Sequence, residues 1–304
     1  MNPILISSAR RRMRSIGTPI IYTIYGTILF AFSYALSLER FQHTQIHMYD
    51  LSQGIQVYIA LVILQFGLIL LIAPTMTAGA LSGERERQTL DLLLMTTTGS
   101  FSLAIGKLLE AFAFVALLIL ASAPFLSLVL LTGGVTVAQL GLSIAFLLVT
   151  AFAALSVGLF ASALFRRTAT ATFMTYLFLF IIGVGTLIPA FLTRNPQISR
   201  IIRDPALLDT IGRGEVFTIL PHILLVNPGV GLLCILSTNG EWFTRLLSSF
   251  TSRGSSFFAL IEKIGYVNVA LINMAIMFGL SWILIFASSL LVRPSTARRR
   301  RKKS

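Results

Sequence analysis

Six long apolar segments recur along the chain, separated by shorter stretches that carry most of the polar and charged residues. A helix needs about 20 mostly apolar residues to cross the roughly 30 Å hydrocarbon core of a bilayer. Lipid offers the backbone no hydrogen-bond partners, so each crossing is predicted to be helical. The pattern therefore predicts an all-α, polytopic integral membrane protein. Its six transmembrane helices are expected at residues 18–38, 55–81, 103–131, 138–164, 171–192 and 266–292.

Residues 193–265, between the fifth and sixth spans, contain one further apolar piece, Val216–Ser237. Pro221 and the run Asn227-Pro228-Gly229 interrupt it, and such residues break a spanning helix. We predict a re-entrant segment rather than a seventh span. Its two short helices would dip into the outer leaflet and be broken at Asn227-Pro228-Gly229.

Residues 1–17 show a different helical pattern. Asn2 and Pro3 form a helix-start signal, and an apolar face then lies opposite a face that carries arginines. This favours an interfacial amphipathic helix on the inner membrane surface, with its arginines on anionic headgroups. The alternative is an unstructured basic anchor. The apolar face would consist of Leu5, Ile6, Ala9, Met13 and Ile16.

Composition excludes whole classes of protein. Of the 304 residues, 56% are hydrophobic and only 12% are charged, against about 25% charged in a typical soluble domain. So few charges cannot coat the core that a chain of this length would form in water. A soluble globular enzyme is therefore excluded.

The net charge of +13 is concentrated at the two ends of the chain. Four basic residues lie among the first fourteen positions, and seven lie in the basic tail at 293–304. Basic residues that flank apolar spans mark cytoplasmic segments, so both termini are predicted to be cytoplasmic and the number of crossings even. No basic surface with interleaved aromatic residues lies between the ends, which argues against a nucleic-acid partner.

The segment after the second span, 82–102, carries the most informative polar pattern. Four alternating charges at 84–87 are followed by leucines, of which Leu90, Leu93 and Leu94 would share one helical face. A short cytoplasmic helix with charged and leucine-rich parts suits contact with a soluble partner. The alternative is an ordinary solvated loop.

This run, Thr77–Leu94, resembles the ABC type-2 permease family, the membrane subunits of a class of ATP-driven transporters. Gly106-Lys107, Pro124 and Asn227-Pro228 also resemble segments of that family, as does the opening Asn2-Pro3 with its following arginines. Two departures are visible. Ser8-Ala9 stands where one branch has Lys-Glu-Leu, and Gln88 stands where glycine is commoner.

The resemblance implies that two permease subunits pair and that each presents the helix after its second span to an ATP-binding subunit. ATP and Mg²⁺ would sit on that partner, because this chain has no G-x-x-x-x-G-K-[ST] loop and needs no cofactor of its own. The implied coupling residues are Glu84, Arg85, Glu86, Arg87, Thr89, Leu90, Asp91, Leu93 and Leu94, and the implied outer gate is Pro221, Asn227, Pro228 and Gly229.

Other polar residues allow more than one interpretation. Lys107 and Glu110 could pair on one helix face near the inner interface or form an intramembrane ion site. His43 and His47, with Asp50 nearby, have metal-ligand spacing if helical, but no third ligand can be placed.

A stripe of small residues on the fourth span, Ala154, Gly158 and Ser162, predicts close helix packing rather than substrate contact. Three polar residues in the other spans could line a pathway or bond between helices: Gln65, Asn268 and Asn273.

The sequence thus predicts a single transmembrane permease domain over 1–304, the subunit of an ABC exporter in a prokaryotic plasma membrane. Its expected partners are a separate ABC ATPase, a second permease subunit of the same or a different kind, and lipid. The alternatives are a secondary transporter or channel, an intramembrane enzyme, and an anchor that recruits an ATPase for signalling. The first two need several buried charges or a cluster of catalytic side chains, and the spans show neither pattern.

Overall fold

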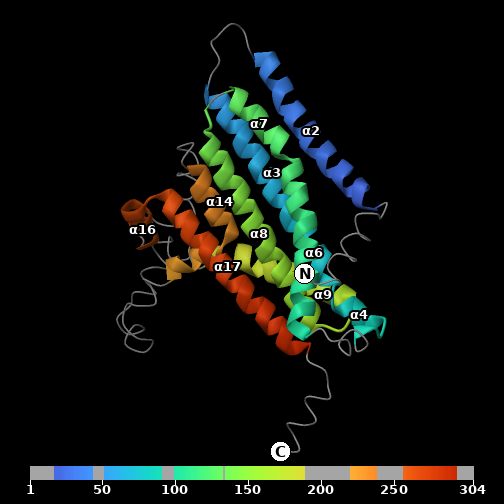
Figure 1. The fold of residues 1–304 in the computed structure, drawn as a ribbon. Coiled ribbons are helices and arrows are strands. Elements are labelled where there is room, and N and C mark those ends of the chain that lie inside the picture. Colours follow the sequence, from blue (N-terminus) through green and yellow to red (C-terminus); the bar gives the residue numbers. More distant parts are fainter. Residues whose placement is uncertain are drawn as a thin grey trace, which may run out of the picture. The chain divides into compact units, whose positions relative to one another are not determined.

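The computed structural model describes residues 17–43, 51–90, 99–132, 134–188, 220–237 and 256–292. Every regular element within these ranges is a helix, and six helices are long and apolar enough to cross a membrane (Figure 1). The all-α, six-span prediction is therefore confirmed. The N-terminal amphipathic helix and the basic tail lie outside the described residues, as do His47 and Asp50.

The observed helices extend the predicted spans by a few residues or stop a few residues short of them. The elements that form the spans are α2 (Gly17–His43), α3 (Leu51–Ala78), α6 (Ser100–Ala121) with α7 (Ala123–Thr132), α8 (Val137–Leu164), α9 (Thr168–Phe180) and α17 (Tyr266–Leu291). The short elements are α4 (Ser82–Glu86), the π-helix η1 (Ile181–Gly185), the 3₁₀-helix η2 (Leu220–Val226), α14 (Pro228–Ser237) and α16 (Ser256–Ile264).

The third span differs from the single helix expected over 103–131. It is broken at Ser122 into α6 and α7. Pro124 follows two residues later and has no backbone N–H to donate to the preceding turn. The buried amide of Gln65 donates to Ser122 Oγ at 2.5 Å, and Ser122 Oγ donates to the Ile119 carbonyl at 2.6 Å. Gln65 therefore bonds between helices at the break.

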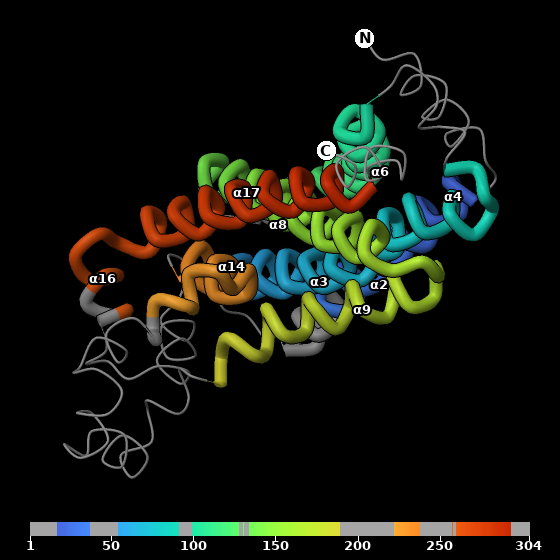
Figure 2. The backbone as a smooth tube through the Cα atoms, turned by 90° about the horizontal axis from the view of Figure 1, so that it is seen from below, coloured from blue at the N-terminus to red at the C-terminus, as the bar shows by residue number. Residues whose placement is uncertain are grey.

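The chain divides into two compact units, 1–177 with 278–304, and 178–277. In the first unit, α3 packs along the length of α8, with α6 against both (Figures 1 and 2). The small-residue stripe of α8 makes this packing possible. A Cβ atom on Gly158 would overlap Thr77 Oγ1 and lie 3.1 Å from the Pro74 carbonyl oxygen. The packing role predicted for this stripe is confirmed.

Aromatic rings hold the second half of α17 in the first unit. Phe152 of α8 stacks on Phe278 with ring centroids 5.5 Å apart, and Phe112 of α6 meets Phe152 edge-on at 5.5 Å. Trp282 lies one turn beyond Phe278, at 6.2 Å. Such pairs contribute about 1 kcal/mol each beyond the area they bury.

The second unit contains η1, η2, α14, α16 and the first half of α17. The apolar piece before the sixth span forms two short helices, η2 and α14, with the break at Asn227 as predicted. Pro228 begins α14, where its missing N–H costs nothing. The described part of this piece is too short to cross a membrane.

Candidate functional site

The charged segment after α3 is held beside the fourth span by one serine. The backbone leaves α3 at Ala78, turns, and enters the five-residue helix α4. Ser162 Oγ, on the small-residue stripe of α8, accepts hydrogen bonds from the backbone N–H groups of Leu81 at 2.8 Å and Ser82 at 2.9 Å. These are donors that a helix start leaves without intrahelical partners. The stripe thus fixes the position of α4 as well as that of α3.

Glu84 ties α4 to the third span. Its carboxylate pairs with Lys107 Nζ of α6 at 3.1 Å and accepts from the Thr89 hydroxyl at 2.5 Å. The two charged side chains are about a quarter exposed. Partial burial alone would raise the pKa of Glu84, but the hydrogen bonds from Thr89 and Lys107 outweigh it and leave the pKa below its usual value. The carboxylate is therefore held in its charged form.

Arg85 ties α4 to the end of the fourth span. Its Nη1 donates to the Ala163 carbonyl at 2.7 Å. Ala163 lies in the last turn of α8, where carbonyl groups lack intrahelical partners and the helix dipole is negative. A guanidinium group at this place satisfies the carbonyl and complements the dipole.

Glu86 ties α4 to the start of the fifth span. Its two carboxylate oxygens accept from Thr168, one from the backbone N–H at 3.0 Å and one from the hydroxyl at 2.6 Å. Thr168 is the first residue of α9, so a carboxylate caps the positive end of that helix. The hydrogen bonds from Thr168 hold the pKa of Glu86 below its usual value.

The Glu86 cap predicts a specific dependence of stability on pH. Because the pKa is lower in the folded chain, the cap stabilises the fold above the unfolded-state value of 4.5, and its contribution is lost as the pH falls through the folded value. The melting temperature of Glu86→Gln should therefore lie below that of the wild type near neutral pH. The difference should vanish in acid. A difference in melting temperature that stays constant across the titration would contradict the prediction.

The structure ends the charged helix earlier than the sequence pattern suggested. α4 stops at Glu86, and Gln88 follows with φ +57°. This is a left-handed backbone conformation that glycine adopts most easily, which accounts for the glycine commoner at this position in the resembling family. Arg87 and Gln88 are exposed, whereas Leu90 is buried. Asp91, Leu93 and Leu94 lie outside the described residues.

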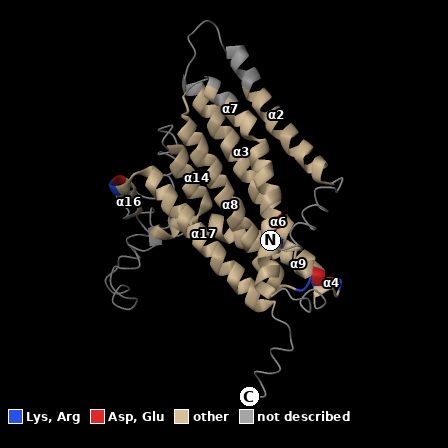
Figure 3. Cartoon of the chain, viewed as in Figure 1, with Lys and Arg blue, Asp and Glu red and all other residues tan. Residues whose placement is uncertain are grey.

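Around these contacts lies a polar cavity of about 390 Å³, bordered by α3, α4, α6 and the start of α9. Gly79 and Gly83 bring the backbone before and within α4 close to Thr168, since a Cβ on Gly79 would come within 3.1 Å of the threonine methyl. Figure 3 shows acidic and basic residues at α4, in contrast to α3 and α8, which carry no Lys, Arg, Asp or Glu.

Asn227, one of the residues implied as an outer gate, bonds to the end of the fifth span within the second unit. Its amide nitrogen donates to the Gly183 carbonyl at 2.7 Å and to Thr186 Oγ1 at 2.8 Å, and its Oδ1 accepts from the Gly229 N–H at 2.8 Å. Gly183 lies in the π-helix η1, and π-helical turns occur frequently at functional sites. Pro228 is buried beside Asn227, and Pro221 lies in η2.

Asn273 of α17 completes this group. Its amide nitrogen donates to the carbonyl groups of Leu225 at 2.5 Å and Asn227 at 3.1 Å. Asn273, like Gln65, therefore bonds between elements. Asn268 instead bonds back to the Ile264 carbonyl at 2.7 Å, one turn earlier in the chain.

Sequence reasoning missed several partners of the predicted site. Lys107 pairs with Glu84, a residue of a different helix, and the Gly106-Lys107 motif was the one signal for it. Ser162 appeared as a packing residue, without its role toward α4. Thr168 and Thr186 gave no signal, because a threonine at a helix end has many uses.

These features define a polytopic membrane protein of the transport-permease class, in which a short charged helix is fixed to three of the spans. The model of the ABC-2 family transporter proteins matches residues 6–290, so the chain belongs to that family, whose permeases work with ABC ATPase subunits. No curated protein matches the chain.

Proposed function

We propose that this permease is driven by a separate ABC ATPase that pushes on α4, and that it exports its substrate. The observation that carries the proposal is the contact set of α4. Glu84, Arg85 and Glu86 are consecutive, and each contacts a different span: the third, the fourth and the fifth.

This arrangement suits transmission of force. A displacement of α4 cannot be absorbed by one neighbour, because charged groups at three consecutive positions hold three helices. The hydrogen bonds are charge-assisted, and such bonds are about twice as strong as neutral ones. In an ordinary solvated loop, the charged side chains would face water and would not each bond to a different span.

The contact surface for the ATPase would be the exposed residues beside these bonds. Arg87 and Gln88 are exposed at the end of α4, and Arg166 and Arg167 are exposed in the turn between α8 and α9. These three exposed arginines, one after α4 and two between α8 and α9, favour an acidic surface on the partner. ATP and Mg²⁺ would be bound by that partner.

The fifth span would carry the movement to the outer gate. It begins at Thr168, which Glu86 holds, and continues through η1 to Thr186, which Asn227 holds. In this proposal both termini are cytoplasmic, the permease works as a pair in a prokaryotic plasma membrane, and Pro221, Asn227, Pro228 and Gly229 form the gate at the outer side.

Cross-linking tests the contact with the ATPase. The natural Cys234 is the only cysteine, so Cys234→Ala gives a cysteine-free background. Adding Gln88→Cys and co-expressing a candidate partner ABC ATPase should give a permease–ATPase cross-link with a short bifunctional reagent. Val137→Cys, at the opposite end of α8 and 72% exposed, is the matched control and should give none.

Equal cross-linking from both positions, or none from Gln88→Cys while the two proteins co-purify, would contradict this role of α4. Substrate-stimulated ATP hydrolysis by the complex would separate a transporter from a signalling anchor. Flux driven by an ion gradient without the ATPase would favour the secondary-transporter alternative.

A further inference from the structure

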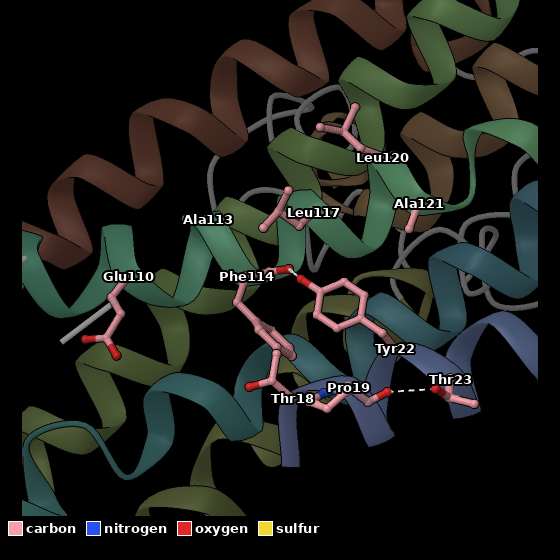
Figure 4. Close-up of a pocket in the computed structure, with 10 residues that line it drawn as sticks. All are labelled: Thr18, Pro19, Tyr22, Thr23, Glu110, Ala113, Phe114, Leu117, Leu120 and Ala121. Carbon is pink, nitrogen blue, oxygen red and sulfur yellow. Dashed lines mark hydrogen bonds between the residues drawn. The ribbon is translucent and has the colours of Figure 1, made fainter. Parts of the chain in front are cut away.

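A groove in the first unit lies between the first span, α2, and the third, α6. Its volume is about 700 Å³, within the ~300–1,000 Å³ typical of small-molecule sites. Figure 4 shows α6 side chains from Glu110 to Ala121 along one wall and the start of α2 along the other. The lining is mostly apolar. Glu110 is its one charged residue and Thr18 lies at the start of α2, while the hydroxyl of Thr23, further along α2, donates to the Pro19 carbonyl at 2.8 Å.

Tyr22 and Phe114 hold the two walls together. The Tyr22 hydroxyl donates to the Phe114 carbonyl at 3.0 Å, and the two rings meet edge-on with centroids 5.2 Å apart. Because the hydroxyl is bonded to the backbone of α6, the tyrosine contributes its ring rather than a polar group to the groove. The groove is therefore a formed site with an apolar floor.

The groove has the length of one lipid leaflet. From Glu110 to Ala121, α6 rises about 16 Å, which is roughly half of the ~30 Å hydrocarbon core. Leu117 and Leu120 on this wall are 43% and 54% exposed, so the groove opens sideways. A hydrocarbon tail could enter it from the bilayer without passing through water.

The charge at one end selects the headgroup. Glu110 places an acidic side chain where the tail of a bound molecule would meet its head, while nearby Lys107 is engaged by Glu84. We propose that the α2–α6 groove binds one tail of an amphiphile with an amine headgroup. Binding of the amine requires the negative charge of the Glu110 side chain at this end of the groove. It does not require that the carboxylate lack other contacts.

Photolabelling of the purified permease in lipid nanodiscs tests this site. The probes are a dodecylamine and a dodecanoate with the same diazirine in the tail. The amine should label residues 18–23 of α2 about fivefold more than the carboxylate, the selectivity expected of one partly exposed charge pair. Glu110→Gln should make the two probes equal without removing tail labelling.

Two substitutions should fill the groove and abolish labelling by both probes, Ala113→Trp and Ala121→Phe. If one of these two variants does not fold, the other variant alone tests the site. The matched control is Leu109→Trp, on an exposed α6 position outside the groove, which should leave labelling unchanged. Labelling spread evenly over lipid-facing helices, unaffected by both filled variants, would overturn the proposal, as would equal labelling by both probes in the wild type.

Two sources share this chemistry, a resident aminolipid and a transported amine. Competition by phosphatidylethanolamine in the nanodisc identifies a resident lipid. A loss of dodecylamine label when ATP and the partner ATPase are added identifies a transported amine, and only this arm rests on the proposed function. The labelling measurements use the permease without an ATPase, so their result does not depend on whether ATP hydrolysis drives transport.

Discussion

Replacing Gly158 by leucine should prevent the permease from folding. A Cβ at this position already overlaps Thr77 Oγ1 and lies 3.1 Å from the Pro74 carbonyl oxygen, and the remaining leucine atoms would have to enter the α3–α8 contact. The Thr77 hydroxyl cannot move freely, because it donates to the Leu155 carbonyl at 2.8 Å. Adding even one or two methylenes to a packed interior costs about 1–3 kcal/mol, and a leucine adds four carbons.

The same helix offers a matched control, Gly141→Leu. Gly141 is exposed, and nothing lies within 4 Å of a Cβ built there. Leucine favours a helix over glycine by roughly 1 kcal/mol, so this variant should be as stable as the wild type or more so. Size-exclusion profiles and melting temperatures in one detergent compare the two. A monodisperse Gly158→Leu protein with the wild-type melting temperature would show that the contact is not as close as described.

Reversing the charge of Glu84 should nearly abolish coupled transport. Glu84→Lys removes the bond to Thr89 and places two ammonium groups where the carboxylate and Lys107 now meet at 3.1 Å. Both side chains are only about a quarter exposed, so water screens this repulsion less than at a free surface. Loss of roughly 1.4 kcal/mol of coupling lowers transport about tenfold, and like-charge repulsion adds to the loss.

The exchanged pair, Glu84→Lys with Lys107→Glu, separates pairing from folding. It restores opposite charges at the same place, so substrate-stimulated ATP hydrolysis and transport should recover to within severalfold of the wild type, although the Thr89 bond stays lost. Lys107→Glu alone should be as impaired as Glu84→Lys alone. If the exchanged pair is no better than either single variant, the ion pair between α4 and the third span does not carry the coupling.

The spans could be predicted from sequence because an apolar run of twenty residues has few ways to satisfy its backbone in lipid. The predicted ends of the spans differ from the observed helix ends by a few residues where polar side chains bond to backbone groups of other elements. At the third span, Pro124 was visible in the sequence, but its effect on Ser122 depends on the buried Gln65, which comes from a different helix. A single helix was therefore predicted where the structure has two.

The charged run at 84–87 stands out in the sequence, but its local pattern does not indicate which groups the charges contact. Alternating charges suit a partner surface and an internal network equally well. Ser162 bonds to the backbone at the start of α4, and Thr168 bonds to Glu86 of this run. Each lies about 80 residues away in the sequence, so residue spacing could not predict either contact. Gln88 was noted only as a departure from glycine, and its positive φ shows why the position matters.

The break at Ser122 divides the third span into two rods joined inside the hydrocarbon layer. The longer rod, α6, carries Lys107 and one wall of the groove, and the shorter rod, α7, extends about 15 Å beyond the joint. A change in tilt of about 10° at such a joint moves the far tip of α7 by roughly 3 Å while α6 keeps its register with α3 and α8. Pro124 cannot donate a backbone hydrogen bond across this joint, so bending the span here costs less than bending it within α6 or α7.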